Sequence, residues 1–100
     1  LIDKITRKLF IMMWLIVRWF IVYNSEIYAV DIKAKIGLRI KSLRLDANLS
    51  QEDLALKAGI DRTYINSVEN GKRNISIINI NKITKALDTS LADFFNSDIF

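Results

Sequence analysis

The chain has 100 residues, which is the length of a single domain, and 51% of them are hydrophobic while 26% are charged. It contains neither Cys nor His, which excludes a disulfide framework, a Cys or His metal site and any Ser-His or Cys-His nucleophile pair. The net charge of +4 is a mild basic excess, which is compatible with nucleic-acid binding but does not identify it.

The apolar residues are concentrated in residues 1–30, which we treat as a leader preceding a domain at residues 31–100. Within the leader, an apolar run from Leu9 to Tyr23 is broken only by Arg18 and is shorter than the roughly 20 residues needed to span a bilayer. Arg18 adds about 2.5–3.5 kcal/mol to the free energy of membrane insertion. Basic residues between Lys4 and Lys8 precede the run, as they do in signal peptides.

Four interpretations of the leader stay open. It is a helix packed on the domain or on a second subunit, an interfacial membrane anchor, a cryptic signal sequence, or upstream sequence translated from a misplaced start. The last is included because the chain begins with Leu1, and Met12, Met13 and Val30 are alternative starts. Membrane contact of residues 9–23 is not favoured, because a spanning run would keep the basic residues inside and place residues 31–100 outside the cytoplasm.

The first helix of the domain is expected over about residues 32–47. Ile36, Ile40, Leu43 and Ala47 recur at spacings of three and four residues, which predicts one apolar stripe facing a core. Asn48 follows at the place where a helix commonly ends with a residue in the left-handed conformation.

Two short helices come next, each with its own start residue. Ser50 is expected to cap the second helix, with Asp53 at the reciprocal capping-box position, and Gly59 ends it. Asp61 caps a third helix, which runs to about Asn70. Because only Ala-Gly-Ile separates the two helices, the pair has the geometry of a helix-turn-helix.

Two more helices complete the domain. Ser76 caps a fourth helix through Leu87, and Ser90 with Asp93 caps a short fifth one carrying Phe94. Without any proline, the chain has no obvious helix breaker. The predicted fold class is all-α: a compact five-helix helix-turn-helix domain preceded by an apolar N-terminal segment that is itself helical.

The third helix is expected to present an unusual outer face. With Ile65 and Val68 turned inward, the outward residues are small, uncharged and polar, with Arg62 and Tyr64 beside them in the first turn. Arg suits guanine, Asn suits adenine and Thr suits the thymine methyl group, so the face fits a DNA major groove. An ordinary capped surface helix is the alternative. The outward residues are Thr63, Asn66, Ser67 and Asn70.

Residues 34–96, with the segments SQEDLALKAGIDRTYINSVENGKRN and KALDTSLADFF, resemble the phage-repressor/Cro-like (XRE) helix-turn-helix family. Within that family, Asp-Arg-Thr-Tyr-Ile at 61–65 and Arg-Asn at 73–74 look most like the controller proteins of restriction–modification systems. The resemblance implies a lambda-repressor-like fold. Residues 1–30 have no counterpart in the family. Asp88 stands where the family usually has Gly, so a strained turn is expected there.

The resemblance also implies roles for individual residues. Base reading falls to Arg62, Thr63 and Ser67, with Tyr64 and Asn66 contacting base or backbone nearby. Phosphate binding falls to Gln51, Asn70, Lys72, Arg73 and Asn74. Arg44 and Glu69 match a structural ion pair between helices, which makes catalysis by Glu69 the weaker interpretation. Each of these side chains could also be an ordinary core, cap or surface residue.

The function implied by the resemblance is that of a sequence-specific transcriptional regulator. It would bind double-stranded DNA in the cytoplasm, at the nucleoid, as a homodimer on a pseudo-palindromic operator, and control a restriction–modification operon. We expect no enzyme activity, catalytic residue, metal or cofactor. An antitoxin or prophage-type repressor and a membrane-anchored protein-interaction domain are the alternatives. Some residues would serve a dimer interface, unless they belong to the core or the chain end: Ile78, Phe95, Ile99 and Phe100.

Overall fold

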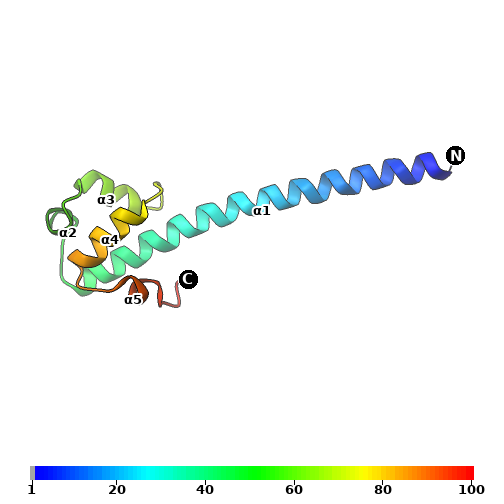
Figure 1. Ribbon diagram of the computed structural model, residues 1–100. Helices are drawn as coiled ribbons and strands as arrows, with labels where there is room; N and C mark the ends of the chain where they lie inside the picture. Colours follow the sequence, from blue (N-terminus) through cyan, green and yellow to red (C-terminus); the bar gives the residue numbers. More distant parts are fainter. Residues whose placement is uncertain (1) are drawn as a thin grey trace.

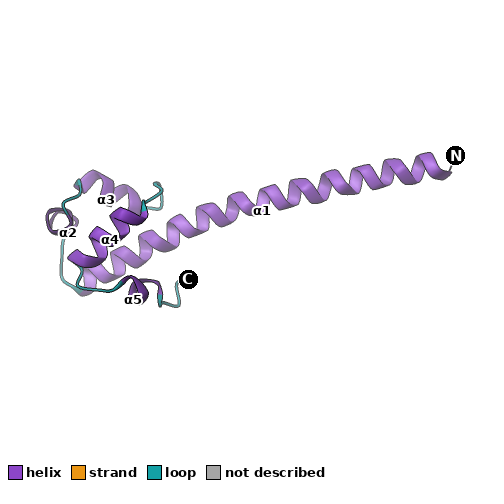
Figure 2. Cartoon of the chain, in the orientation of Figure 1, coloured by secondary structure: helices purple, strands orange, loops and turns teal. Residues whose placement is uncertain are grey.

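The computed structural model describes the backbone of residues 2–100 and the side chains of residues 3–24 and 31–100. These residues form five helices: α1 (Ile2–Asp46), α2 (Gln51–Ala58), α3 (Arg62–Glu69), α4 (Ile77–Ala86) and α5 (Leu91–Phe95). No strand occurs among them, which confirms the all-α prediction (Figure 2).

One 45-residue helix, α1, joins the leader to the domain. The prediction of a separate helix over residues 32–47 was therefore wrong at its start. The expected boundary after residue 30 lies inside α1, since neither Pro nor Gly interrupts the chain before Gly37. The predicted end of that helix near residue 47 agrees with the observed end at Asp46, but Ala47, which the apolar stripe placed toward the core, is exposed. Leu1 lies outside the described residues.

The N-terminal half of α1 projects away from the other helices as a single rod (Figure 1). The molecule therefore measures 71 × 25 × 20 Å, so only its C-terminal part is compact. Within the described part of the chain, no helix combines the length and the apolar character needed to cross a membrane.

The hydrophobic core lies where the C-terminal half of α1 meets the four shorter helices. The apolar positions of the predicted periodicity supply it, because residues three and four apart share one helix face. Side chains from all five helices take part. The core residues with at most 5% of their surface exposed are Ile40, Leu54, Ala55, Ile65, Val68, Ile80, Ile83 and Phe94.

The predicted helix starts and the expected left-handed residues are confirmed. Ser50 and Asp53 form a complete capping box at α2, and the hydroxyls of Ser76 and Ser90 accept main-chain N–H bonds at α4 and α5. Asn48 and Asp88 have φ angles of 57° and 53°, in the left-handed region that favours glycine. Since Asp88 is not glycine, the turn after α4 carries the predicted strain.

Candidate nucleic-acid interface

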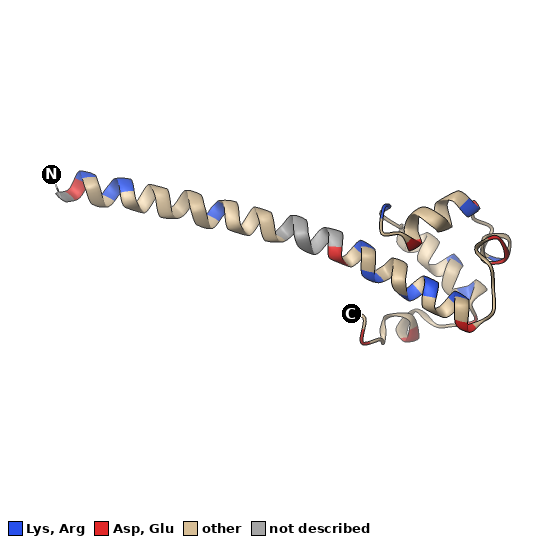
Figure 3. Cartoon of the chain, turned by 180° about the vertical axis from the view of Figure 1, so that it is seen from behind, with Lys and Arg blue, Asp and Glu red and all other residues tan. Residues whose placement is uncertain are grey.

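Lys and Arg residues occur near the start of α1, at one point in its apolar run, in its C-terminal part and around the domain (Figure 3), so net charge alone does not mark one face for DNA. The outer face of α3 is more distinctive. The helix itself begins after Asp61, whose side chain accepts a hydrogen bond from the Thr63 main-chain N–H. It follows a turn at Gly59, whose φ is 67°. Ile65 and Val68 are buried beneath it, which fixes the rotation of α3 as the sequence predicted.

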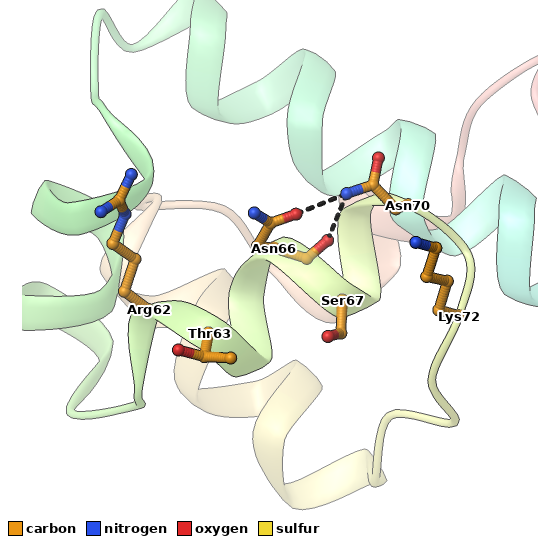
Figure 4. A pocket seen from close by; sticks show the side chains of 6 residues that line it. All are labelled: Arg62, Thr63, Asn66, Ser67, Asn70 and Lys72. Carbon is orange, nitrogen blue, oxygen red and sulfur yellow. Dashed lines mark hydrogen bonds between the residues drawn. The ribbon is translucent and has the colours of Figure 1, made fainter.

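The predicted polar face of α3 is accessible and borders a hollow of about 340 Å³. Thr63, Asn66 and Asn70 are exposed, whereas Ser67 is half-buried. Figure 4 shows Arg62 and Lys72 at opposite ends of this row, with the small polar side chains between them. No carboxylate is among the lining residues, which are Arg62, Thr63, Asn66, Ser67, Asn70 and Lys72.

Asn66 and Asn70 are linked to each other across one turn of α3. The Asn70 Nδ2 atom donates to the Asn66 side-chain oxygen and to its main-chain oxygen, the latter at 2.9 Å. Figure 4 shows both bonds. They fix the two amide groups relative to one another, so the Asn66 nitrogen and the Asn70 oxygen are the atoms turned away from the pair.

Tyr64 and Arg73 also come together, although nine residues separate them. The Arg73 guanidinium lies 4.9 Å from the centroid of the Tyr64 ring, which is a cation–π contact. Tyr64 is half-buried against the core, so it both covers the core edge and holds the Arg73 side chain beside α3.

Lys33 was missed by the sequence reasoning. It lines a second hollow of about 220 Å³ together with Arg73 and Asn74, two of the predicted phosphate-binding residues. Its position three residues before Ile36, on the same side of α1, was a signal that could have found it. The structure thus brings a cation from α1 next to the loop that follows α3.

Arg44, Glu69 and Gln51 form a buried network that joins α1, α3 and α2. The Arg44 Nε atom lies 2.7 Å from Glu69 Oε1, and Arg44 Nη1 donates to the Leu49 carbonyl oxygen at 2.8 Å. Both charged residues are only 7% exposed. The expected ion pair is therefore present, with its charges hydrogen-bonded as burial requires.

Gln51 lies at the first position of α2, where a phosphate contact was expected. Its side-chain amide donates to Glu69 Oε2 and so points into the protein rather than outward. The main-chain N–H groups of the first turn of α2 lie beside it, and a helix N-terminus attracts anions. In this arrangement the side chain of Gln51 is hydrogen-bonded to Glu69 and is therefore not turned toward a phosphate.

Two short helices joined by a glycine turn, with a polar and accessible second helix, define a helix-turn-helix protein. The chain belongs to the helix-turn-helix family, whose sequence pattern matches residues 40–94. It is 47% identical to the control protein C.MunI of Mycoplasma sp over 70 residues, which are 69% of this chain and 93% of that protein.

Solved structures of restriction–modification controller proteins have the same fold. The crystal structure of C.AhdI from Aeromonas hydrophila matches with a TM-score of 0.61 and 44% identity, covering 63% of this chain and 96% of that one. A C.Esp1396I tetramer in complex with its natural 35-base-pair operator matches with a TM-score of 0.61 and 41% identity, covering 63% and 83%. These similarities confirm the resemblance to the controller proteins.

Proposed function

We propose that the chain is a controller protein of a restriction–modification system, a transcriptional regulator that binds a specific DNA sequence. The observation that carries the proposal is the accessible, carboxylate-free face of α3, with Arg62 at one end and Lys72 at the other. Relatives named as control proteins support it, since 47% and 44% identity extend over this same part of the chain. The proposed role is binding without catalysis.

In the proposed complex, α3 enters the major groove and the regulator acts as a homodimer. Two copies of α3 would meet successive major grooves about 34–36 Å apart on a pseudo-palindromic operator. Arg62, Thr63 and Ser67 read base edges, with Tyr64 and Asn66 beside them. The phosphate contacts come from the start of α2 at Gln51 and from the residues after α3: Asn70, Lys72, Arg73 and Asn74.

The proposed operon is the one that holds the chain's own gene and the genes of a restriction–modification system, and its promoter would contain the operator. This role places the protein in the cytoplasm, associated with the nucleoid. Binding to the upstream DNA and a change in reporter transcription from that promoter would support the assignment. A promoter fragment bound no better than random DNA would overturn it.

Arg62→Ala and Lys72→Ala separate base reading from phosphate binding. We expect Arg62→Ala to weaken the free energy of binding to the operator by about 1–3 kcal/mol and to relax the sequence preference at one base pair. Lys72→Ala should weaken binding to operator and random DNA alike, because a phosphate carries no sequence information. Fluorescence anisotropy with labelled operator, single-base variants and random duplexes measures both effects.

Lys85→Ala is the control for charge, since Lys85 is exposed on α4 and does not line the hollow beside α3. It should leave both affinities unchanged. If Arg62→Ala and Lys72→Ala lowered affinity equally on operator and random DNA, the base-reading role of Arg62 would be wrong.

A further inference from the structure

The N-terminal half of α1 lies outside the packed domain (Figure 1), and its exposed side chains are mostly apolar. Between Leu9 and Tyr23, the large apolar side chains are exposed by 48% at Tyr23 to 73% at Phe10. Together they present on the order of 1,000 Å² of apolar surface. Monomeric soluble proteins rarely expose a contiguous apolar patch above a few hundred Å². The area is comparable to the roughly 800 Å² that each partner buries in a standard interface.

This surface has the spacing of a helix that packs against other helices. Leu9, Met13, Ile16, Phe20 and Tyr23, which we call the seam, alternate at spacings of four and three residues. They occupy the a and d positions of a heptad, where packed helices place their knobs. The three charged residues between positions 5 and 23 fall at the outer b, c and f positions, and they are Arg7, Lys8 and Arg18. The other outer positions of this segment are apolar and exposed: Ile11, Trp14, Leu15, Ile21 and Val22.

The flanking e and g positions widen the seam. Phe10 and Val17 lie on one side of it, and Met12 and Trp19 lie on the other, all exposed. The Trp19 and Tyr23 rings stack at 5.3 Å with an angle of 11°, so the edge of the seam includes a fixed aromatic surface. A single partner helix covers mainly a and d, whereas apolar e and g positions favour a bundle of more than two helices.

We propose that residues 5–23 are a self-association surface, on which the same segment from other copies of this chain packs as a helical bundle. The exposed area and the positions of the cations both fit this occupant. Copies meeting along the seam bury the side chains at a, d, e and g while the cations of every helix stay outside, where Arg18 already lies 5.4 Å from the Trp14 ring. The inference is independent of the DNA-binding role, because it concerns residues outside the matched helix-turn-helix region.

An anionic lipid surface fits the charge pattern less well. A helix lying on lipid has a strongly charged face opposite its apolar face. Between Leu9 and Tyr23 the face opposite the seam carries one cation, Arg18, beside exposed apolar side chains such as Ile11 and Trp14. A bundle does not require such a charged face, and it leaves Arg18 outside.

Ile16 and Ile11 provide a matched test of the seam. The two side chains are 61% and 58% exposed on the same helix, but Ile16 lies at d and Ile11 at f. The purified full chain, Ile16→Lys and Ile11→Lys should be compared by sedimentation velocity over a concentration series. We expect Ile16→Lys to raise the dissociation constant of the assembly about tenfold or more, because it buries an unpaired ammonium. Ile11→Lys should assemble like the parent chain.

Three results would overturn the proposal. The first is one molar mass shared by the parent chain and both variants. The second is an equal loss of assembly in both variants, which would indicate non-specific apolar association. The third is flotation of the parent chain with phosphatidylglycerol vesicles at high salt together with dissociation into smaller species, which would make lipid the occupant. Circular dichroism and operator binding of each variant verify that the domain stays folded.

Discussion

Gly37 sets the distance between α1 and α3. A Cβ atom at this position would lie 2.8 Å from the Glu69 main-chain oxygen and closer still to the Val68 main-chain oxygen. Both atoms belong to the backbone of α3 and cannot rotate aside as a side chain could. Because Glu69 also bonds Arg44 from the same end of α3, one glycine and one ion pair together fix the position of α3 on α1.

We predict that Gly37→Ala destabilises the domain and weakens DNA binding. Alanine favours the helical state by about 0.8–1.0 kcal/mol. Overpacking against a rigid neighbour costs about 1–3 kcal/mol and moves α3 away from α1, so we expect a net loss. Urea denaturation and operator binding measure the two effects.

Leu38→Ala is the control for Gly37→Ala, since Leu38 is the next residue of α1 and is 54% exposed. It should change stability and affinity little. A Gly37→Ala protein as stable as its parent would show that α1 and α3 do not meet as closely as described.

At the scale of the element, α2 depends on its capping box. The Ser50 hydroxyl accepts from the Asp53 N–H, and the Asp53 carboxylate accepts from the Ser50 N–H at 3.1 Å. Hydrogen bonding of the Asp53 carboxylate to the Ser50 backbone, and then to the Ser50 side chain, lowers the pKa of Asp53 from its usual value of 3.8. The carboxylate form is therefore favoured in the folded state.

We predict that the contribution of Asp53 to stability is lost in acid. Because folding lowers its pKa, the contribution is fully present above pH 3.8 and disappears as the pH falls through the lower pKa of the folded state. Asp53→Asn should be less stable than the parent at neutral pH, and this difference should shrink below pH 3.8. Thermal unfolding across a pH series measures it.

Glu52→Gln is the control for Asp53→Asn, because it removes a charge from the same turn and keeps the capping box. A stability difference between Asp53→Asn and the parent that stays constant with pH would contradict the assignment.

The start and end of each short helix could be predicted because the residues responsible are local. Ser50, Asp61, Ser76 and Ser90 bond main-chain groups two or three residues away, so the sequence alone contains the information. The start of α1 could not be predicted in this way. A change in composition near residue 30 suggested a boundary, but composition does not break a helix, and the sequence has neither Pro nor Gly there.

In the candidate site, too, some side-chain positions could be predicted from local sequence and others could not. Periodicity was enough to place Thr63 and Asn66 outward and Ile65 inward, because helix geometry fixes their directions. The direction of the Gln51 side chain and the stacking of Arg73 on Tyr64 depend on how separate segments fold together. The sequence pattern carries no information on those two side-chain rotamers or on the path of the loop after α3.

At the scale of the whole molecule, two groups of cations have different expected roles. Lys72 and Arg73 lie beside α3 or in the loop after it, whereas Lys4 and Lys8 lie near the start of α1, on the half that projects from the domain. Figure 3 shows basic residues in both places. Only the first group adjoins the face proposed to enter the groove. A net charge of +4 is too small to draw the whole surface onto DNA, so the salt dependence of binding should come from a few contacts.

We therefore predict that the two groups of cations affect the salt dependence differently. Each phosphate neutralised by the protein contributes about 0.9 to the slope of log affinity against log salt concentration. Lys72→Ala with Arg73→Ala should reduce that slope by about 1.8 on operator and random DNA alike. Lys4→Ala with Lys8→Ala should leave it unchanged. Anisotropy titrations at several salt concentrations measure the slopes, and an equal reduction in both double variants would mean that the projecting half of α1 also contacts DNA.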